Sequence, residues 1–180
     1  MKHIISTPSP YLTKSAQPVA KINSRVKQVI TDMKQAIKEP QHPKGVGLAA
    51  PQIGVDWRIF IIWPDRKQTM QVFINPQFVN KSRLLTSGVP NRKNPLEGCL
   101  SIPKVWGLVK RHTWVILAYL TETGEKKTVK FTGFTATIIQ HEMDHLDGIL
   151  FPRRVLEQKG KLYKPGKDDE GKPVLELLEI

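Results

Sequence analysis

A His-Glu-Met-Asp-His stretch at residues 141–145 carries the most distinctive chemistry in this sequence. It lies in an apolar run, TIIQHEMDHLDGIL, which predicts a helix over residues 134–147. Because a helix completes a turn in about 3.6 residues, His141 and His145 would lie on the same face, where two imidazoles can bind one divalent metal ion. Glu142, beside the first histidine, could transfer protons. The pattern therefore predicts a hydrolytic metal site, although five residues can also match by chance.

A catalytic metal site of this type usually has three protein ligands and a water molecule. No histidine follows His145, so a third histidine downstream is excluded. Four glutamates do follow, in a Lys-rich stretch or in the apolar terminus: Glu157, Glu170, Glu176 and Glu179. Cys99, the single cysteine, is the better candidate because a thiolate binds zinc or ferrous iron well and Gly98 allows close approach of the backbone. A lone cysteine is nevertheless more often a small buried apolar residue.

A third segment, GVGLAAPQ at residues 45–52, is small, apolar and interrupted by glycines. Alone it is typical of a turn that leads into a strand. Together, GVGLAAPQ, EGCLS and QHEMDHLDG occur in the order and approximate spacing of the three signature motifs of peptide deformylases. The chain resembles this family over about residues 4–152, most strongly from Gly45 onward. Its members remove the formyl group from N-formylmethionine at the start of new bacterial or organellar polypeptides.

The resemblance implies a metal centre formed by Cys99, His141 and His145, with water as the fourth ligand. It favours ferrous iron as the single divalent ion, and Zn²⁺, Ni²⁺ or Co²⁺ could take the same ligands. Glu142 would accept a proton from the attacking water and deliver it to the departing amine, so that formate is released.

The resemblance also assigns groups that contact the substrate. The backbone N–H of Leu100 and the side-chain amide of Gln52 would stabilise the oxyanion, and one such donor contributes roughly 3–4 kcal/mol. Three residues would present main chain to the peptide as an added strand: Gly45, Val46 and Gly47. The methionine slot would be formed by Val46, Phe134, Thr137 and Ile138, although Thr137 departs from the apolar residue expected there.

Further residues near the motifs also give expectations. Trp106 occupies a position where many relatives carry Arg or Tyr, which puts the usual substrate contact there in doubt. We expect Glu97 and Arg111 to pair behind the site, with a surface ion pair as the alternative. Asp144 faces away from the proposed metal and should make a structural hydrogen bond.

At 180 residues and 39% hydrophobic content, the chain is long enough for one domain with a core. Residues 1–152 would form the catalytic domain and residues 153–180 a basic extension with an apolar end. The net charge of +12 favours anionic partners such as RNA. Six basic residues follow the last motif: Arg153, Arg154, Lys159, Lys161, Lys164 and Lys167. We expect a solvated, partly disordered tail there; a sharper hypothesis is docking on the ribosome near the tunnel exit.

No apolar run reaches membrane-spanning length, and the opening residues lack the apolar core of a secretory signal. A single cysteine fits a reducing compartment. The first 31 residues contain no acid, which is typical of organellar transit peptides, but the Pro-rich opening belongs to the resemblance. We therefore expect a bacterial cytoplasmic protein rather than an organellar one, with neither a membrane nor DNA as a partner.

The remaining pattern predicts the elements that must position these residues. Apolar spacing predicts a helix over about residues 22–37, and the strand-like segments are 57–63, 71–74 (ending at Asn75-Pro76) and a hairpin of 114–120 with 126–131. Residues 82–95 should be a polar loop, and 173–180 either an edge strand or a short helix. This order predicts an α+β fold, with antiparallel sheets packed around a central metal-binding helix and an N-terminal amphipathic helix.

Two other functions remain open from the sequence. A metalloprotease of the His-Glu-x-x-His type would not depend on Cys99. A non-catalytic relative could use the basic extension to bind ribosomes, although the proposed metal ligands and Glu142 are all present.

Overall fold

A computed structural model describes residues 2–39, 44–90 and 94–179. Its helices are η1 (Pro10–Leu12), α1 (Ser24–Ala36), η2 (Ala50–Ile53), α2 (Gly133–Leu146) and α3 (Phe151–Glu157). Its strands are β1 (Gly47–Ala49), β2 (Ile59–Ile62), β3 (Gln71–Lys81), β4 (Leu85–Ser87), β5 (Glu97–Cys99), β6 (Ile102–Gly107), β7 (Lys110–His112), β8 (Trp114–Leu120), β9 (Lys126–Thr132), β10 (Leu162–Lys167) and β11 (Pro173–Leu177). The α+β class with antiparallel sheets is confirmed.

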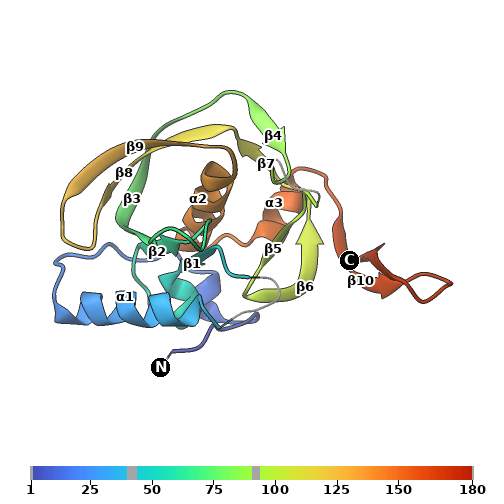
Figure 1. Cartoon of the computed structure of the whole chain (residues 1–180), viewed down its shortest axis with the longest axis horizontal. Coiled ribbons are helices and arrows are strands. Elements are labelled where there is room, and N and C mark those ends of the chain that lie inside the picture. The colour runs from blue at the N-terminus through green and yellow to red at the C-terminus, as the bar shows by residue number, and fades with distance from the viewer. Residues whose placement is uncertain (1, 40–43, 91–93, 180) are drawn as a thin grey trace.

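In the described residues the strands form one five-stranded sheet in the order β1-β2-β3-β8-β9, one four-stranded sheet in the order β11-β10-β6-β5, and the pair β4-β7. Figure 1 shows α2 between the larger sheet and the strands β5 and β6. β1 and β5 each stand at the end of their sheet, so each has a backbone edge that no other strand of the described ranges pairs with.

α2 is buried along most of its length. Its buried residues are both apolar, such as Ile138 and Ile139, and polar. It contacts β1 and β2 on one side and β7 and β9 elsewhere. Gly148, which follows the helix, has φ +70°, and a Cβ there would collide with the backbone of Thr13. The chain therefore turns sharply at glycine before α3 begins. None of the helices in the described ranges is long and apolar enough to cross a membrane.

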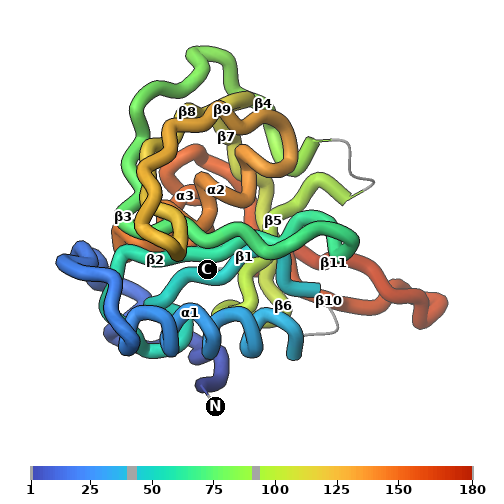
Figure 2. The backbone as a smooth tube through the Cα atoms, turned by 60° about the vertical axis from the view of Figure 1, so that its left-hand side comes forward, coloured from blue at the N-terminus to red at the C-terminus, as the bar shows by residue number. Residues whose placement is uncertain are grey.

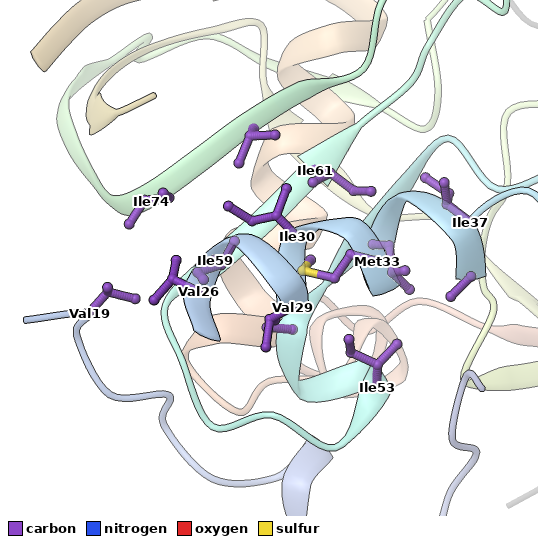
Figure 3. Packing of buried hydrophobic residues seen from close by; sticks show 14 residues of the cluster. Val19, Val26, Val29, Ile30, Met33, Ile37, Ile53, Ile59, Ile61 and Ile74 are labelled. Atoms are coloured by element: carbon purple, nitrogen blue, oxygen red, sulfur yellow. The ribbon is translucent and has the colours of Figure 1, made fainter. Parts of the chain in front are cut away.

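α1 packs one face onto the larger sheet. The Asn23 side chain caps its first turn by accepting a hydrogen bond from the Val26 N–H at 3.1 Å. Figure 3 shows Ile30 and Met33 of the helix directed at Ile59 and Ile61 of β2. This contact anchors β2, and through it β1, beneath the site.

A second core lies between the larger sheet and α2, and aromatic rings form its centre. The Phe73 ring stacks on Phe60 at 4.5 Å between centroids and lies 4.4 Å from Tyr119. Phe131 meets the same ring edge-on at 5.7 Å. Such aromatic pairs add to the free energy gained by burying their area.

The predicted end of the second strand at Asn75-Pro76 is wrong, because β3 continues to Lys81. Asn75 adopts φ +50°, and its side-chain amide exchanges two hydrogen bonds with the backbone of Val19, at 2.7 and 2.8 Å. Pro76 has no N–H to donate, and the register with β8 shifts between Ile74 and Gln77. A β-bulge at Asn75 and Pro76 therefore interrupts the pairing locally, and the strand continues beyond it.

The prediction that residues 82–95 form only a polar loop is also wrong in part, since Leu85–Ser87 forms β4 and pairs with β7. Residues 91–93 of that segment lie outside the described residues. The predicted hairpin is confirmed: β8 and β9 pair over their whole length.

The expected disordered tail after residue 152 is replaced by regular structure in the described residues. β10 and β11 form a hairpin, which settles the open choice for residues 173–177 as a strand. β10 also pairs with β6 through Leu162 opposite Gly107 and Tyr163 opposite Trp106. Figures 1 and 2 both show this hairpin extending from the body of the protein beyond β6. Leu162 is buried against Val155 of α3, so the sheet and the helix hold the base of the hairpin.

Replacing Phe73 by Ala should lower the free energy of unfolding by about 3–5 kcal/mol, because it removes a fully buried ring from between its aromatic partners. Urea unfolding measures the change. Leu84→Ala is the control: that side chain is 71% exposed, and the expected change is within about 0.5 kcal/mol. Similar losses for the two variants would contradict this account of the core.

Candidate metal centre and active site

The structure brings Cys99, at the end of β5, beside His141 and His145 of α2. Their potential ligand atoms all lie within 4.8 Å of one another. Cys99 Sγ is 3.2 Å from His145 Nε2. Typical bond lengths in a tetrahedral site place sulfur and nitrogen ligands about 3.5 Å apart, so the side chains need only small movements to share one ion.

The charges in this cluster favour a thiolate. Burial raises the pKa of the Cys99 thiol, but His145 and His141 oppose it and hold the pKa well below its ordinary value. Burial lowers the pKa of His141, yet the hydrogen bonds that its ring donates to Cys99 and Glu97 outweigh it and raise that pKa well above its ordinary value. A deprotonated sulfur is the form that binds a metal.

Glu97 and Arg111 form the predicted pair, and both are buried rather than at the surface. Arg111 donates from Nε and Nη2 to the two carboxylate oxygens of Glu97, at 2.9 Å each. Burial raises the pKa of Glu97, but Arg111 outweighs it and lowers that pKa to about 2. The same carboxylate lies 3.2 Å from His141 Nδ1, which leaves Nε2 of that ring to face the cluster.

Asp144 makes the predicted structural hydrogen bonds, and its partners extend the network. It accepts a hydrogen bond from Arg111 Nη1 at 2.6 Å and bonds from Arg154 Nη2 and Nε at 2.7 and 3.1 Å. Arg154, which is partly exposed, therefore joins this network of charges and does not belong to a free basic tail. No local sequence pattern predicts this contact, because a turn at Gly148 separates the two helices that carry the partners.

Glu142 is buried beside the cluster, and one of its oxygens, Oε2, has no hydrogen-bond partner among the described residues. Burial, the largest influence, raises the pKa of its carboxyl to about 7 although both histidines of the cluster lower it. A Cβ at Gly47 would overlap this carboxylate. Glycine at that position therefore lets β1 approach Glu142 closely.

Gln52 is fixed by three neighbours. Its Oε1 accepts a hydrogen bond from the Ala49 N–H at 2.8 Å. Its Nε2 donates to Ser101 Oγ at 3.1 Å and lies 3.6 Å from Cys99 Sγ. Ser101 is completely buried and was not singled out by the sequence, although it directly follows the Leu100 of the same motif.

A cavity of about 230 Å³ opens over these groups. β1 and the residues before it contribute Gly45, Val46 and Gly47; α2 contributes Phe134, Thr137 and Ile138. Leu100, Gln52 and Trp106 also line it. All the sequence-predicted residues of the site except His145 thus line one cavity, next to the edge strands β1 and β5, and His145 lies behind Cys99.

The donor set fits a divalent cation. One thiolate and two imidazoles converge, and His145 Nδ1 is buried with no hydrogen-bond partner in the described part of the chain. Zinc and ferrous iron both accept sulfur and nitrogen ligands. The Cys99, His141 and His145 group could therefore hold one metal ion.

The comparison with known proteins agrees with this geometry. The sequence pattern of the family described as polypeptide deformylase matches residues 1–161. The chain belongs to the peptide deformylase family. Members of this family are metal-dependent hydrolases that act on formylated peptides, so the resemblance inferred from the three motifs is confirmed.

Individual relatives support the assignment over most of the chain. A peptide deformylase of Symbiobacterium thermophilum is 36% identical over 176 residues, which is 97% of this chain and 76% of the relative. The crystal structure of peptide deformylase from Thermotoga maritima has a TM-score of 0.75 at 32% identity, covering 86% of this chain and 97% of that one. A Met-Ala-Ser-bound class I type b peptide deformylase from Acinetobacter baumannii has a TM-score of 0.73 at 32% identity, covering 84% and 96%.

Replacing Arg111 by Met should lower the free energy of unfolding by about 3–5 kcal/mol, because Glu97 and Asp144 would both lose a buried cationic partner. Denaturation of metal-depleted protein measures the change. Arg153→Met is the control, since that arginine is 66% exposed and its pairing with Glu157 contributes little. A loss below about 1 kcal/mol for Arg111→Met would contradict a structural role for the buried charges.

Proposed function

We propose that this chain is a peptide deformylase, which hydrolyses the formamide at the N-terminus of formylmethionyl nascent polypeptides and releases formate. The observation that carries the proposal is that Cys99, His141 and the buried carboxylate of Glu142 line one cavity, with His145 beside Cys99 in the same group of potential ligands. Family membership supports the same reaction.

We propose that Cys99, His141 and His145 are the metal ligands and that α2 is the central metal-binding helix. An ion bound there would polarise the formyl oxygen and lower the pKa of a bound water. We infer Fe²⁺ as the native ion from the family resemblance, with Zn²⁺, Ni²⁺ or Co²⁺ as substitutes.

Glu142 would act as the proton carrier. Its carboxylate accepts a proton from the attacking water as a bond forms to the formyl carbon, and then gives that proton to the amine nitrogen as the C–N bond breaks. A pKa raised to about 7 suits a group that must accept and donate a proton near neutral pH. Gly47 keeps the carboxylate uncrowded by a side chain.

Two donors would stabilise the negative charge that develops on the formyl oxygen. We assign them to the backbone N–H of Leu100 and to Nε2 of Gln52. The amide of Gln52 is held in place because its own oxygen accepts the Ala49 N–H. A donor that is already oriented costs no reorganisation in the transition state.

The peptide would lie as an added strand against the free edge that contains Gly45, Val46 and Gly47. Val46, Phe134, Thr137 and Ile138 would surround the methionine side chain. Thr137 is buried and its hydroxyl donates to the Gly133 carbonyl at 3.4 Å, so its polar atom is directed at the helix backbone. The Acinetobacter baumannii relative with bound Met-Ala-Ser supports a peptide in the corresponding cavity.

The proposal also covers the domain organisation of the chain and its cellular location. We place residues 1–152 in the catalytic domain, residues 153–180 in an extension of it, and α1 as an N-terminal amphipathic helix that supports β2. We propose the bacterial cytoplasm as its location, because formylmethionyl chains are made there and its single cysteine suits a reducing compartment.

The native chain, purified without oxygen and loaded with Fe²⁺, should release formate from formyl-Met-Ala-Ser. Glu142→Ala should keep one metal per chain and lose at least about 10²-fold in kcat/KM, since it removes the proton carrier. Cys99→Ala should lose both metal and activity. Formate release by Cys99→Ala would contradict the thiolate as an essential ligand. Cleavage of internal peptide bonds by that variant would instead favour a metalloprotease that does not need the thiolate.

We further propose that the basic extension docks on the ribosome. Arg153 and Arg154 both pair with Glu157, and Lys172 pairs with Glu170, whereas Lys159, Lys161 and Lys164 form no ion pair within the described part of the chain. Lys159, Lys161 and Lys164 replaced together by Gln should weaken co-sedimentation with ribosomes, most clearly at low salt. Deleting the extension would be a poor test because it removes Arg154 from Asp144. Unchanged binding by the triple variant would contradict the proposal.

A further inference from the structure

The four-stranded sheet has two faces of different character. Residues directly opposite each other in antiparallel strands place their side chains on the same face. Gly107 of β6 lies opposite Leu162 of β10, and Leu162 packs with Phe151 and Val155 of α3. Leu178, just after β11, packs against the same cluster. This face is therefore the covered one.

The other face forms a row that begins in the active-site cavity. Gly98 lies opposite Trp106, Trp106 opposite Tyr163, and Tyr163 opposite Leu177. Gly98 and Trp106 both line the cavity. The Trp106 ring covers Gly98 so closely that a Cβ there would lie 3.1 Å from it. The row thus continues from the cavity floor across three strands onto the hairpin.

The outer part of this row is apolar and exposed. Leu175 shares the face with Leu177 because they are two residues apart, and Leu175 lies opposite Pro165. Leu175 and Leu177 are 41% and 48% exposed. We call the set Trp106, Tyr163, Pro165, Leu175 and Leu177 the apolar shelf. Adjacent exposed apolar side chains on a chain of net charge +12 indicate a binding surface.

We propose that the apolar shelf binds apolar side chains of the substrate downstream of its formylmethionine. This inference rests on the proposed function and adds a preference among its substrates. A peptide that follows the row from Gly98 to Leu177 crosses three strand spacings, about 14 Å. An extended chain covers that distance in about four residues. All shelf residues except Trp106 also lie after residue 161, where the match to the family pattern ends.

We assign the apolar shelf to the substrate and not to a second copy of the chain, because the shelf is continuous with the cavity that would hold the formyl end of the peptide. Pairing of β10 with β6 fixes the shelf relative to that cavity. A chain leaving the cavity over Trp106 therefore meets Tyr163 and then the two leucines.

The test compares formyl-Met-Ala-Ser extended by four leucines with the same peptide extended by four serines. In the native chain the leucine peptide should have the higher kcat/KM by about tenfold, the factor expected from covering roughly half of two leucine side chains. In Leu175→Ser combined with Leu177→Ser the ratio should fall to about one. Val174→Ser is the matched control: it is 38% exposed on the opposite face of the same strand, and its ratio should stay near that of the native chain.

Calorimetric titration with the same peptides lacking the formyl group measures the ratio of Kd values without any reaction. A tenfold Kd ratio that the double variant abolishes supports the shelf, even where the native chain releases no formate. The absence of formate release would contradict only the proposed function. Formate release with a ratio near one in the native chain overturns the shelf alone. A ratio that is unchanged in the double variant also overturns the shelf as a substrate-binding surface. If sedimentation then shows that only the native chain dimerises, the face is assigned to self-association.

Discussion

The buried position of Arg111 between Glu97 and Asp144 is the interaction on which the rest of the site depends. One guanidinium pairs with a carboxylate on β5 and another on α2, and all three side chains are buried. Breaking such a contact leaves uncompensated buried charge, which is far more costly than losing a surface pair. Because Glu97 also contacts His141, the same arginine sets the orientation of a proposed metal ligand. Arg154 extends the network to α3.

Two glycines determine how β1 and α2 are arranged around the site. β1 can approach Glu142 only because Gly47 has no side chain, and the helix turns away at Gly148 for a similar reason. The result is a cavity lined by the Glu142 carboxyl, the Cys99 thiol and the His141 imidazole. Burial raises the pKa of Glu142 to about 7, and Arg111 lowers that of Glu97 to about 2, so two acids that line the same cavity differ in charge near neutral pH.

Two histidines a helical turn apart predicted a metal site, and the resemblance to the family added Cys99 and the segment Gly45–Gly47 to it. The structure places Cys99, His141 and that segment at one cavity, with His145 beside Cys99. The Glu97–Arg111 pair and the β8–β9 hairpin were also predicted. The course of β3 was not, because the bulge at Asn75 depends on a distant backbone contact with Val19. The role of Arg154 and the hairpin after it were missed for the same reason: sheet pairing and buried ion pairs between separate elements leave no local pattern.

The central claim is that Cys99 and the two α2 histidines bind one divalent ion. Optical spectroscopy of the protein loaded with Co²⁺ tests it most directly, because a thiolate ligand gives a sulfur-to-cobalt charge-transfer band that imidazole and carboxylate ligands do not. The account predicts this band in the native chain and in Glu142→Ala, at one cobalt per chain, and its loss in Cys99→Ser. A native spectrum without the band, or a band that persists in Cys99→Ser, would contradict it.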